Sequence, residues 1–300
     1  MQKQDFVYTD KSGYKIHLVC LAPDKPQRLI LIPPLVGATG SLAIRDFRYL
    51  LREGCALMSF DYCGHYKGID NKFTINKTFI DTKLAMNYAY EYSKKFGLPL
   101  HVVGICYGAV PLAYIMNELG WPEYVKSMFT VSALVNGILN FEEYNCYLMK
   151  RGISFDNVDR FLEFLSSNEN SSVSIEHVYI SSLTEYLGDM FSELSDIISD
   201  TGFGVLEYSR VEVFEAFHEF ITIELPDIVI PEHFPCLFFS GVQDQIFNLR
   251  SDRSRAKYYE KIRKIAPNAR VRNLRIDHFG RGEDRYVIGR EAMKFLREHE

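Results

Sequence analysis

Short apolar runs alternate with segments of helical spacing through the first third of the chain, and this alternation limits the fold to few classes. The expected strands are Asp5–Thr9, Tyr14–Cys20, Arg28–Ile32, Cys55–Phe60, Leu98–Val103 and Ser127–Val131. The expected helices are Leu42–Arg52, Asn76–Lys95 and Ala109–Leu119. Strands that alternate with helices form a mostly parallel sheet covered by helices on both faces. We therefore expect an α/β protein.

The alternation stops after residue 138 and resumes near residue 233. Between these points, residues 139–232 show helix-like segments rich in Phe, Tyr and acidic residues, without a clear strand. The later elements are the expected strands Cys236–Ser240 and Ala269–Leu274 and the expected helices Asp252–Ile265 and Asp284–Arg297. We predict an α/β core made of residues 1–138 and 233–300, with residues 139–232 inserted as a helical lid.

Composition excludes several protein classes. Hydrophobic residues make up 47% of the 300 residues and charged residues 24%, which excludes a disordered chain, a collagen-like chain and a disulfide scaffold. No apolar run approaches the roughly 18 residues of a membrane-spanning helix, and the first residues do not resemble a secretory signal. The 6 cysteines show no zinc-binding spacing. We expect a cytoplasmic protein without a membrane span, metal site or cofactor.

Charge is segregated along the chain. Residues 139–232 contain 19 acidic and 4 basic side chains, whereas Arg250–Arg275 contains 10 basic and 2 acidic ones. Such segregation indicates either faces with different partners or attraction between the two regions, and both interpretations stay open. Nucleic-acid binding is not expected, because the net charge is −5 and no recognition motif is present.

A Gly-x-Cys-x-Gly sequence, Gly104-Ile105-Cys106-Tyr107-Gly108, lies between an expected strand and an expected helix. This strand–turn–helix setting is typical of a nucleophile elbow, with cysteine at the position that serine usually occupies. Both glycines are needed because a β-carbon at either position would collide with a neighbouring strand or helix. The start of the following helix favours a thiolate. Cys106 is the predicted nucleophile.

The order of strands also predicts the partners of Cys106. Asp244 follows the strand Cys236–Ser240, and His278 follows the strand Ala269–Leu274. His278 would accept the thiol proton, and Asp244 would hold the imidazole and stabilise its charge. Asp277 is the rival acid, but Asp244 is favoured because a sequence neighbour normally points away from the histidine ring.

Two backbone N–H groups are needed to stabilise an oxyanion. Tyr107, directly after the nucleophile, is expected to supply one of them. The other should come from the loop after Arg28–Ile32, where Pro33 and Pro34 have no N–H. Leu35 and Val36 are both possible, and we favour Val36.

With these motifs the chain resembles the α/β-hydrolase superfamily, and specifically its members with a cysteine nucleophile. Asp61-Tyr62-Cys63-Gly64 is similar to the D-x-x-G turn after the fourth strand of that superfamily, although His65 and Tyr66 break its continuation. The Ile-Pro-Pro loop and Gly-Ile-Cys-Tyr-Gly are similar to polyhydroxyalkanoate synthases. The spacing from Leu31 through Val135 is similar to acyltransferases and thioesterases that act on acyl carriers and use serine.

This resemblance, together with the cysteine, implies acyl transfer through a Cys106 thioester. A thioester intermediate keeps enough free energy to pass its acyl group to an amine, thiol or alcohol. The implied donor is an acyl-carrier protein or a coenzyme A thioester, which the basic segment Arg250–Arg275 could dock. The alternatives are a hydrolase of small esters, lactones or thioesters with the same residues, and a binding protein without catalysis. The five histidines at positions 17, 101, 177, 218 and 233 are interpreted as surface or structural residues, and Cys63 as a packed residue.

Overall fold

The computed structural model describes residues 2–35, 38–65, 73–132, 228–244, 252–276, 280 and 282–300. The predicted lid, residues 139–232, lies outside the described residues except for its last part, residues 228–232. Ile228 and Ile230 are buried against the core, and the Ile230 N–H donates to the Ile265 carbonyl at 2.7 Å.

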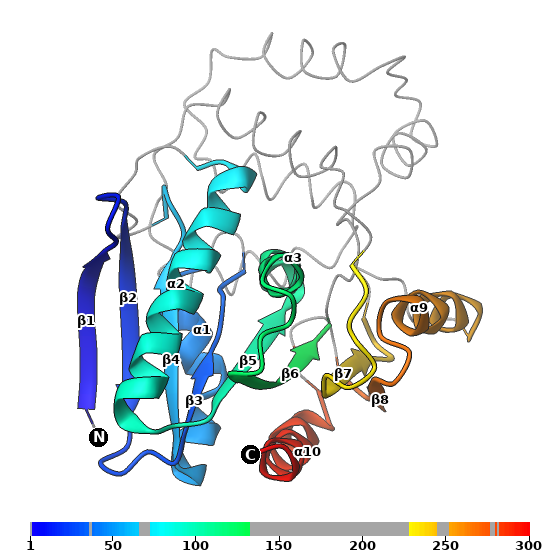
Figure 1. Ribbon diagram of the computed structural model, residues 1–300. Coiled ribbons are helices and arrows are strands. Elements are labelled where there is room, and N and C mark those ends of the chain that lie inside the picture. The colour runs from blue at the N-terminus through cyan, green and yellow to red at the C-terminus, as the bar shows by residue number, and fades with distance from the viewer. Residues whose placement is uncertain are drawn as a thin grey trace, which may run out of the picture.

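The described strands form one sheet in the order β1-β2-β4-β3-β5-β6-β7-β8 (Figure 1). They are β1 (Gln2–Thr9), β2 (Lys15–Ala22), β3 (Arg28–Leu31), β4 (Cys55–Asp61), β5 (Leu100–Ile105), β6 (Val125–Val131), β7 (Cys236–Gly241) and β8 (Arg270–Leu274). The pairs β1–β2 and β2–β4 are antiparallel, and all other neighbours are parallel. The carboxyl ends of the parallel strands therefore meet at one edge of the sheet. The prediction of a mostly parallel α/β sheet is confirmed.

The longer described helices follow strands of the sheet, as predicted. They are α1 (Gly40–Asp46), the 3-10 helix η1 (Arg48–Glu53), α2 (Ile75–Phe96), the 3-10 helix η2 (Cys106–Gly108), α3 (Ala109–Glu118), α9 (Asp252–Ile265) and α10 (Arg285–Glu298). The single helix expected over Leu42–Arg52 is instead divided between α1 and η1. The division falls at Phe47, which is buried against Phe129 and whose N–H turns back to the Ile44 carbonyl at 3.1 Å.

Two apolar cores fill the two faces of the sheet, because successive residues of a strand point to opposite sides. In β5, for example, Val102 belongs to one core and Val103 to the other. Buried residues of α2, α3 and α9 complete the first core, whereas α1, η1 and α10 complete the second. Helices therefore cover both faces, and Figure 1 shows α2 and α3 in front of the sheet.

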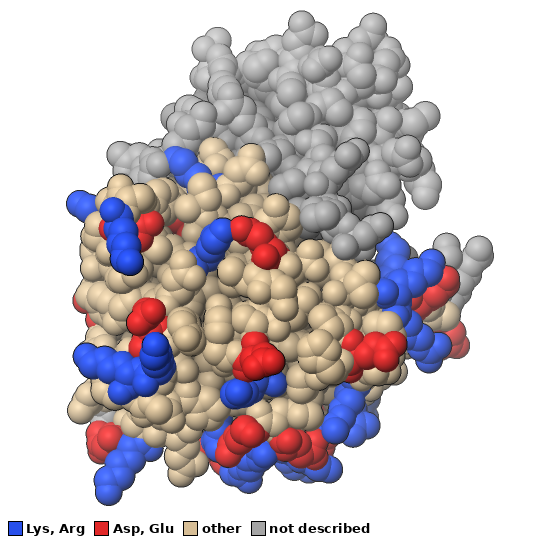
Figure 2. All heavy atoms as spheres, in the orientation of Figure 1, with Lys and Arg blue, Asp and Glu red and all other residues tan. Residues whose placement is uncertain are grey.

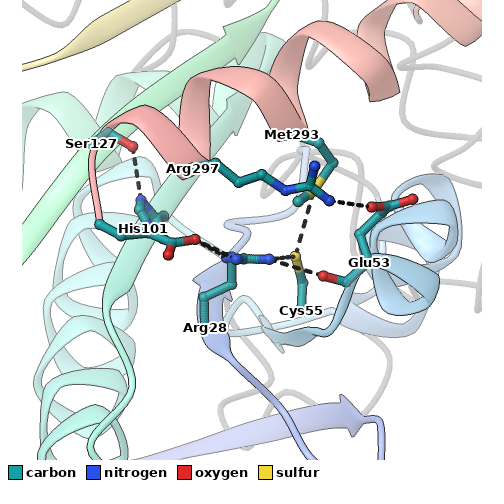
Figure 3. Close-up of polar contacts among 8 residues, drawn as sticks. Arg28, Glu53, Cys55, His101, Ser127, Met293 and Arg297 are labelled. Atoms are coloured by element: carbon teal, nitrogen blue, oxygen red, sulfur yellow. Dashed lines mark hydrogen bonds and ion pairs between the residues drawn. The ribbon is translucent and has the colours of Figure 1, made fainter.

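A buried guanidinium group joins Glu300, which follows the last helix, to the amino-terminal edge of the sheet. Arg28 is 3% exposed, and its Nε donates to Oε1 of Glu300 at 2.9 Å. Its Nη1 donates to the Glu53 carbonyl at 2.9 Å, and Figure 3 shows the Cys55 sulfur between Arg28 and Met293. Because the charge has a carboxylate partner and several acceptors, its burial at this edge is compensated. The opposite edge carries the predicted site.

Candidate active site

Cys106 lies where β5 ends and the chain turns into η2 and α3. Its φ is 45°, in the left-handed region that residues with a side chain rarely adopt. Such a backbone is held only where the surrounding structure determines it, and it is found mostly at functional sites. The thiol is partly exposed, whereas Cys20, Cys55, Cys63 and Cys236 are buried.

The two glycines beside Cys106 are in contact with neighbouring backbone. A β-carbon on Gly104 would lie 2.6 Å from both Cα and Cβ of Ala109, at the start of α3. A β-carbon on Gly108 would lie 2.5 Å from the Pro33 carbonyl oxygen and 2.9 Å from that of Pro34. The predicted collisions are therefore confirmed at both positions. The contact at Gly108 also brings the loop after β3 directly against the turn that carries Cys106.

The side chain of Tyr107 is buried, and its hydroxyl forms a hydrogen bond. The hydroxyl of Thr78 in α2 donates to the Ile75 carbonyl at 2.6 Å, and Thr78 has no second proton. The Tyr107 hydroxyl, 2.6 Å from Thr78 Oγ1, therefore donates to it. This bond fixes the Tyr107 side chain against α2. The backbone N–H of Tyr107 is the group that the sequence assigns to the oxyanion, and that assignment stays a prediction.

Asp244 is 0% exposed and lies in the turn after β7. Its N–H donates to the Gly241 carbonyl at 3.1 Å, which closes the turn. Tyr258 of α9 lies close enough that the negative charge of Asp244 adds to the effect of burial, and both raise the pKa of Tyr258. A buried carboxylate is stable only with a hydrogen-bond donor or a positive charge nearby. The imidazole of a catalytic histidine is such a partner, and His278 is the one that the sequence predicts for Asp244.

His278 and the rival Asp277 lie outside the described residues, but both ends of their segment are described. Ile276 and Gly282 form an antiparallel bridge, and the Gln243 N–H donates to the Ile276 carbonyl at 3.2 Å. The segment after β8 is thus joined to the turn that carries Asp244. A β-carbon on Gly280 would lie 3.4 Å from Cγ1 of Val131, the last residue of β6. The two ends of the segment are therefore fixed at the carboxyl edge, where Cys106 and Asp244 lie.

The loop after β3 is described except at its centre. Pro33 and Pro34 lie against Gly108, and the Ala38 N–H donates to the Leu35 carbonyl at 3.1 Å. Val36, the favoured second oxyanion donor, lies outside the described residues. The sequence-based expectation for this position therefore stays a prediction.

The turn after β4 holds buried ionisable groups that the sequence did not assign. Asp61 accepts from the Gly40 N–H at 2.7 Å, and Asp81 of α2 accepts from the Cys63 N–H at 2.8 Å. Burial raises the pKa of Asp81 to about 6. Burial also lowers the pKa of His65 to about 4. Apart from the D-x-x-G pattern around Asp61, nothing in the sequence marks these residues, because their partners are distant in the chain.

Of the histidines interpreted as surface or structural, His17 and His101 are buried and His233 is exposed. His177 and His218 lie outside the described residues. Cys63 is buried, as the interpretation of a packed residue requires.

In the described part of the chain, no three His, Cys, Asp or Glu side chains gather as a metal site would require. The described helices also include none with the length and apolar character to cross a membrane.

Comparison with known proteins places the fold. No family model matches the sequence, and no curated protein matches it. Among solved structures, the chain is similar to a lipase in its open form, with 13% identity over 99% of both chains and a TM-score of 0.65. A carboxyl esterase from Bacillus coagulans has 13% identity over 100% of this chain and 99% of its own, with a TM-score of 0.64. An alpha/beta hydrolase from Penicillium sp. sh18 has 13% identity, the same coverage and a TM-score of 0.63. The chain therefore has the α/β-hydrolase fold.

Proposed function

We propose that this protein hydrolyses acyl esters or thioesters through a covalent acyl intermediate on Cys106. The observation that carries the proposal is the backbone of Cys106, which has a φ of 45° between two glycines pressed against neighbouring backbone. This conformation presents a nucleophile at the carboxyl edge of the sheet. The neighbouring folds named lipase, esterase and hydrolase support the same class of reaction.

In the proposed reaction, His278 accepts the Cys106 proton and the thiolate sulfur attacks the acyl carbonyl carbon. The carbonyl electron pair moves to oxygen, where the N–H groups of Tyr107 and Val36 stabilise it. The intermediate expels the alkoxide or thiolate leaving group, which receives the proton from His278. Water then attacks the thioester with His278 as base, releasing the acid and free Cys106. Asp244 orients His278 and stabilises its charged form.

An intact-mass experiment tests the intermediate. The protein is incubated with a panel of acyl thioesters and p-nitrophenyl esters, and the expected adduct is one acyl group on Cys106. Cys106→Ala should form no adduct and show no turnover. His278→Ala should lose about as much activity as Cys106→Ala, and Asp244→Asn somewhat less, since residues that act together are not additive. Full activity in Cys106→Ala or in His278→Ala would contradict the proposal.

A second candidate is acyl transfer from an acidic carrier protein or a coenzyme A thioester. It is favoured by the cysteine, whose thioester stays reactive toward an acceptor, and by the basic side chains on α9. Figure 2 shows basic side chains gathered over α9 with acidic ones among them. Arg255 is paired with Asp252 and Lys264 with Glu260, whereas Lys261 and Arg263 form no ion pair within the described residues. Among the described side chains of α9, Lys261 and Arg263 are therefore available to attract an anionic donor.

Two measurements separate the candidates. Hydrolysis predicts that acid appears from a thioester without an added acceptor, whereas transfer predicts that product requires an amine, thiol or alcohol. Reversing the charge of Lys261 and Arg263 should slow reaction with a carrier-bound acyl group, and the difference should shrink as salt is raised. A small thioester should react at an unchanged rate in the same variant. Equal rates for the carrier in variant and wild type would exclude docking on α9.

A further inference from the structure

The loop that precedes α1 is anchored at both of its described ends. At its start, the Ile32 N–H donates to the Met58 carbonyl at 2.8 Å, and the Ser59 hydroxyl donates to the Ile32 carbonyl at 2.6 Å. Both bonds join the loop to β4. At the same end, the carbonyl oxygens of Pro33 and Pro34 lie 2.5 and 2.9 Å from the position that a β-carbon on Gly108 would occupy. The loop therefore packs against the turn that carries Cys106, and a displacement of the loop would displace that turn as well.

Asp61 holds the other end of the loop. Its Oδ1 accepts from the N–H of Gly40, the first residue of α1, at 2.7 Å. A β-carbon on Gly40 would lie 2.8 Å from the Phe60 nitrogen and carbonyl oxygen, so the start of α1 is pressed against β4. Asp61 is 2% exposed, so bulk water does not reach the Gly40 N–H at this point. Without Asp61 this N–H would lose its acceptor, which is costly for a buried group.

The second oxygen of Asp61 belongs to a chain of charged groups that runs from the buried Asp61 through the buried His17 to Asp5, an exposed residue of β1. His17 of β2 is 2.7 Å from Asp61 Oδ2 through Nδ1 and 2.5 Å from Asp5 Oδ1 through Nε2. A carboxylate oxygen lies at each ring nitrogen of His17, an arrangement in which the protonated ring donates to both. Burial lowers its pKa, but the hydrogen bonds to Asp61 and Asp5 outweigh burial and raise it. In its protonated form the ring compensates the charge of the buried Asp61 carboxylate and holds its side-chain rotamer.

We infer that Asp61, held by His17 and Asp5, is a positioning residue for the oxyanion-binding loop between β3 and α1. The inference rests on the proposed function, because it assigns a step of that reaction to the loop. In the proposed reaction this loop supplies the second N–H donor, and the bond from the Gly40 N–H to Asp61 fixes the end of the loop that leads into α1. A donor displaced by about 1 Å loses on the order of 100-fold in rate, so a distant hydrogen bond can control the chemistry.

Two reactions of the same thiol separate this role from a purely structural one. Acylation of Cys106 by a p-nitrophenyl ester passes through an oxyanion and releases p-nitrophenol. Alkylation by iodoacetamide forms an S–C bond and releases iodide without any oxyanion. Both need the Cys106 thiolate, but only acylation needs the loop. The ratio of the two rate constants therefore reports the position of the loop.

In Asp61→Ala we expect acylation to fall by about 100-fold with little change in KM, while alkylation of Cys106 stays within about threefold of wild type. Asp61→Asn keeps an oxygen for the Gly40 N–H and should restore most of the acylation rate. His17→Gln keeps both Asp61 and its bond to Gly40 and should give a smaller fall in the same direction. If Asp61→Ala does not fold, the last two variants decide the question by the same ratio.

Asp81→Ala is the matched control. Asp81 is also buried and also accepts from a backbone N–H, that of Cys63 at 2.8 Å, but its hydrogen bonds among the described residues are to Cys63 and Tyr14, which belong neither to the loop nor to α1. Its loss should leave the ratio of acylation to alkylation unchanged. An unchanged ratio in folded Asp61→Ala or in His17→Gln, or an equal fall in Asp81→Ala, would overturn the inference. If wild-type Cys106 forms no acyl adduct while it is alkylated normally, the proposed function fails instead.

Discussion

Two turns at the carboxyl edge of the sheet are fixed in different ways. The turn from Gly104 to Gly108 is held by close packing of backbone on backbone, and Cys106 is forced to a positive φ. The turn after β4 is held by buried carboxylates, Asp61 and Asp81, that accept from backbone N–H groups. Packing does not respond to pH, whereas buried charges do. The first turn is therefore expected to keep its geometry across pH values at which the second loses stability.

The largest effect is expected from Gly108→Ala. Its new β-carbon would meet two carbonyl oxygens at 2.5 and 2.9 Å, and backbone cannot move aside as a flexible side chain could. We expect the free energy of unfolding to fall by at least about 3 kcal/mol, by the same amount at pH 5 and pH 7. Chemical denaturation at the two pH values measures it.

Gly97→Ala is the control for this substitution. Gly97 has a φ of 65° and open space around it, so alanine there tests the backbone conformation without a collision. Its expected cost is about 1 kcal/mol. If Gly108→Ala costs no more than Gly97→Ala, close packing does not hold the turn of Cys106.

Asp81→Asn should change the pH dependence of stability. Burial raises the pKa of Asp81 from its ordinary value of 3.8 to about 6, so folding favours the protonated form. Its stabilising contribution is complete below pH 3.8 and is lost as pH rises through 6, a fall of about 3 kcal/mol. Asparagine does not titrate, so the difference in unfolding free energy between variant and wild type should grow in favour of the variant over this range. A constant difference from pH 4 to pH 7 would contradict the raised pKa.

Cys106→Gly and Cys106→Ala together measure the strain at the turn. Glycine adopts a φ of 45° freely, whereas alanine does not, so Cys106→Gly should be more stable than Cys106→Ala by about 1 kcal/mol. Ala113→Gly, inside α3, should lower the free energy of unfolding by about 1 kcal/mol. Alanine is thus expected to be the more stable residue at position 113, and glycine the more stable residue at position 106. A Cys106→Gly variant less stable than Cys106→Ala would show that the backbone at Cys106 is not strained.

The smallest change is expected from His17→Gln, because burial and the bonds to Asp61 and Asp5 act on His17 in opposite directions. The raised pKa of His17 means that its charge stabilises the fold fully below its ordinary pKa of 6.5. That contribution is lost as pH rises through the raised value. The stability of wild type should therefore decline relative to His17→Gln above pH 6.5, in a window separate from that of Asp81. An identical pH dependence in the two proteins would show that His17 is not charged in the fold.

Most elements of the fold were predictable from the sequence because their signals are local. The strand β5, expected over Leu98–Val103 and found at Leu100–Ile105, follows from an apolar run, and the helix α9 follows from helical spacing within one segment. The turn at Cys106 was predictable for the same reason, since five consecutive residues carry the pattern. The division of the helix at Phe47 was not predictable, because it depends on a contact with Phe129 in β6.

What the sequence by itself determined is the order of strands and helices and the residue placed at the turn after β5. The turn requires a glycine on each side of Cys106, and both glycines lie within the same five residues. A requirement of this kind can be recognised from the sequence alone. Only the tertiary structure decided which charged side chains meet around the buried Asp61. Asp5, His17 and Asp61 come from three neighbouring strands, and their pairing depends on the register between β1, β2 and β4. Such a register depends on the packing of both faces of the whole sheet, so spacing along the chain does not encode it.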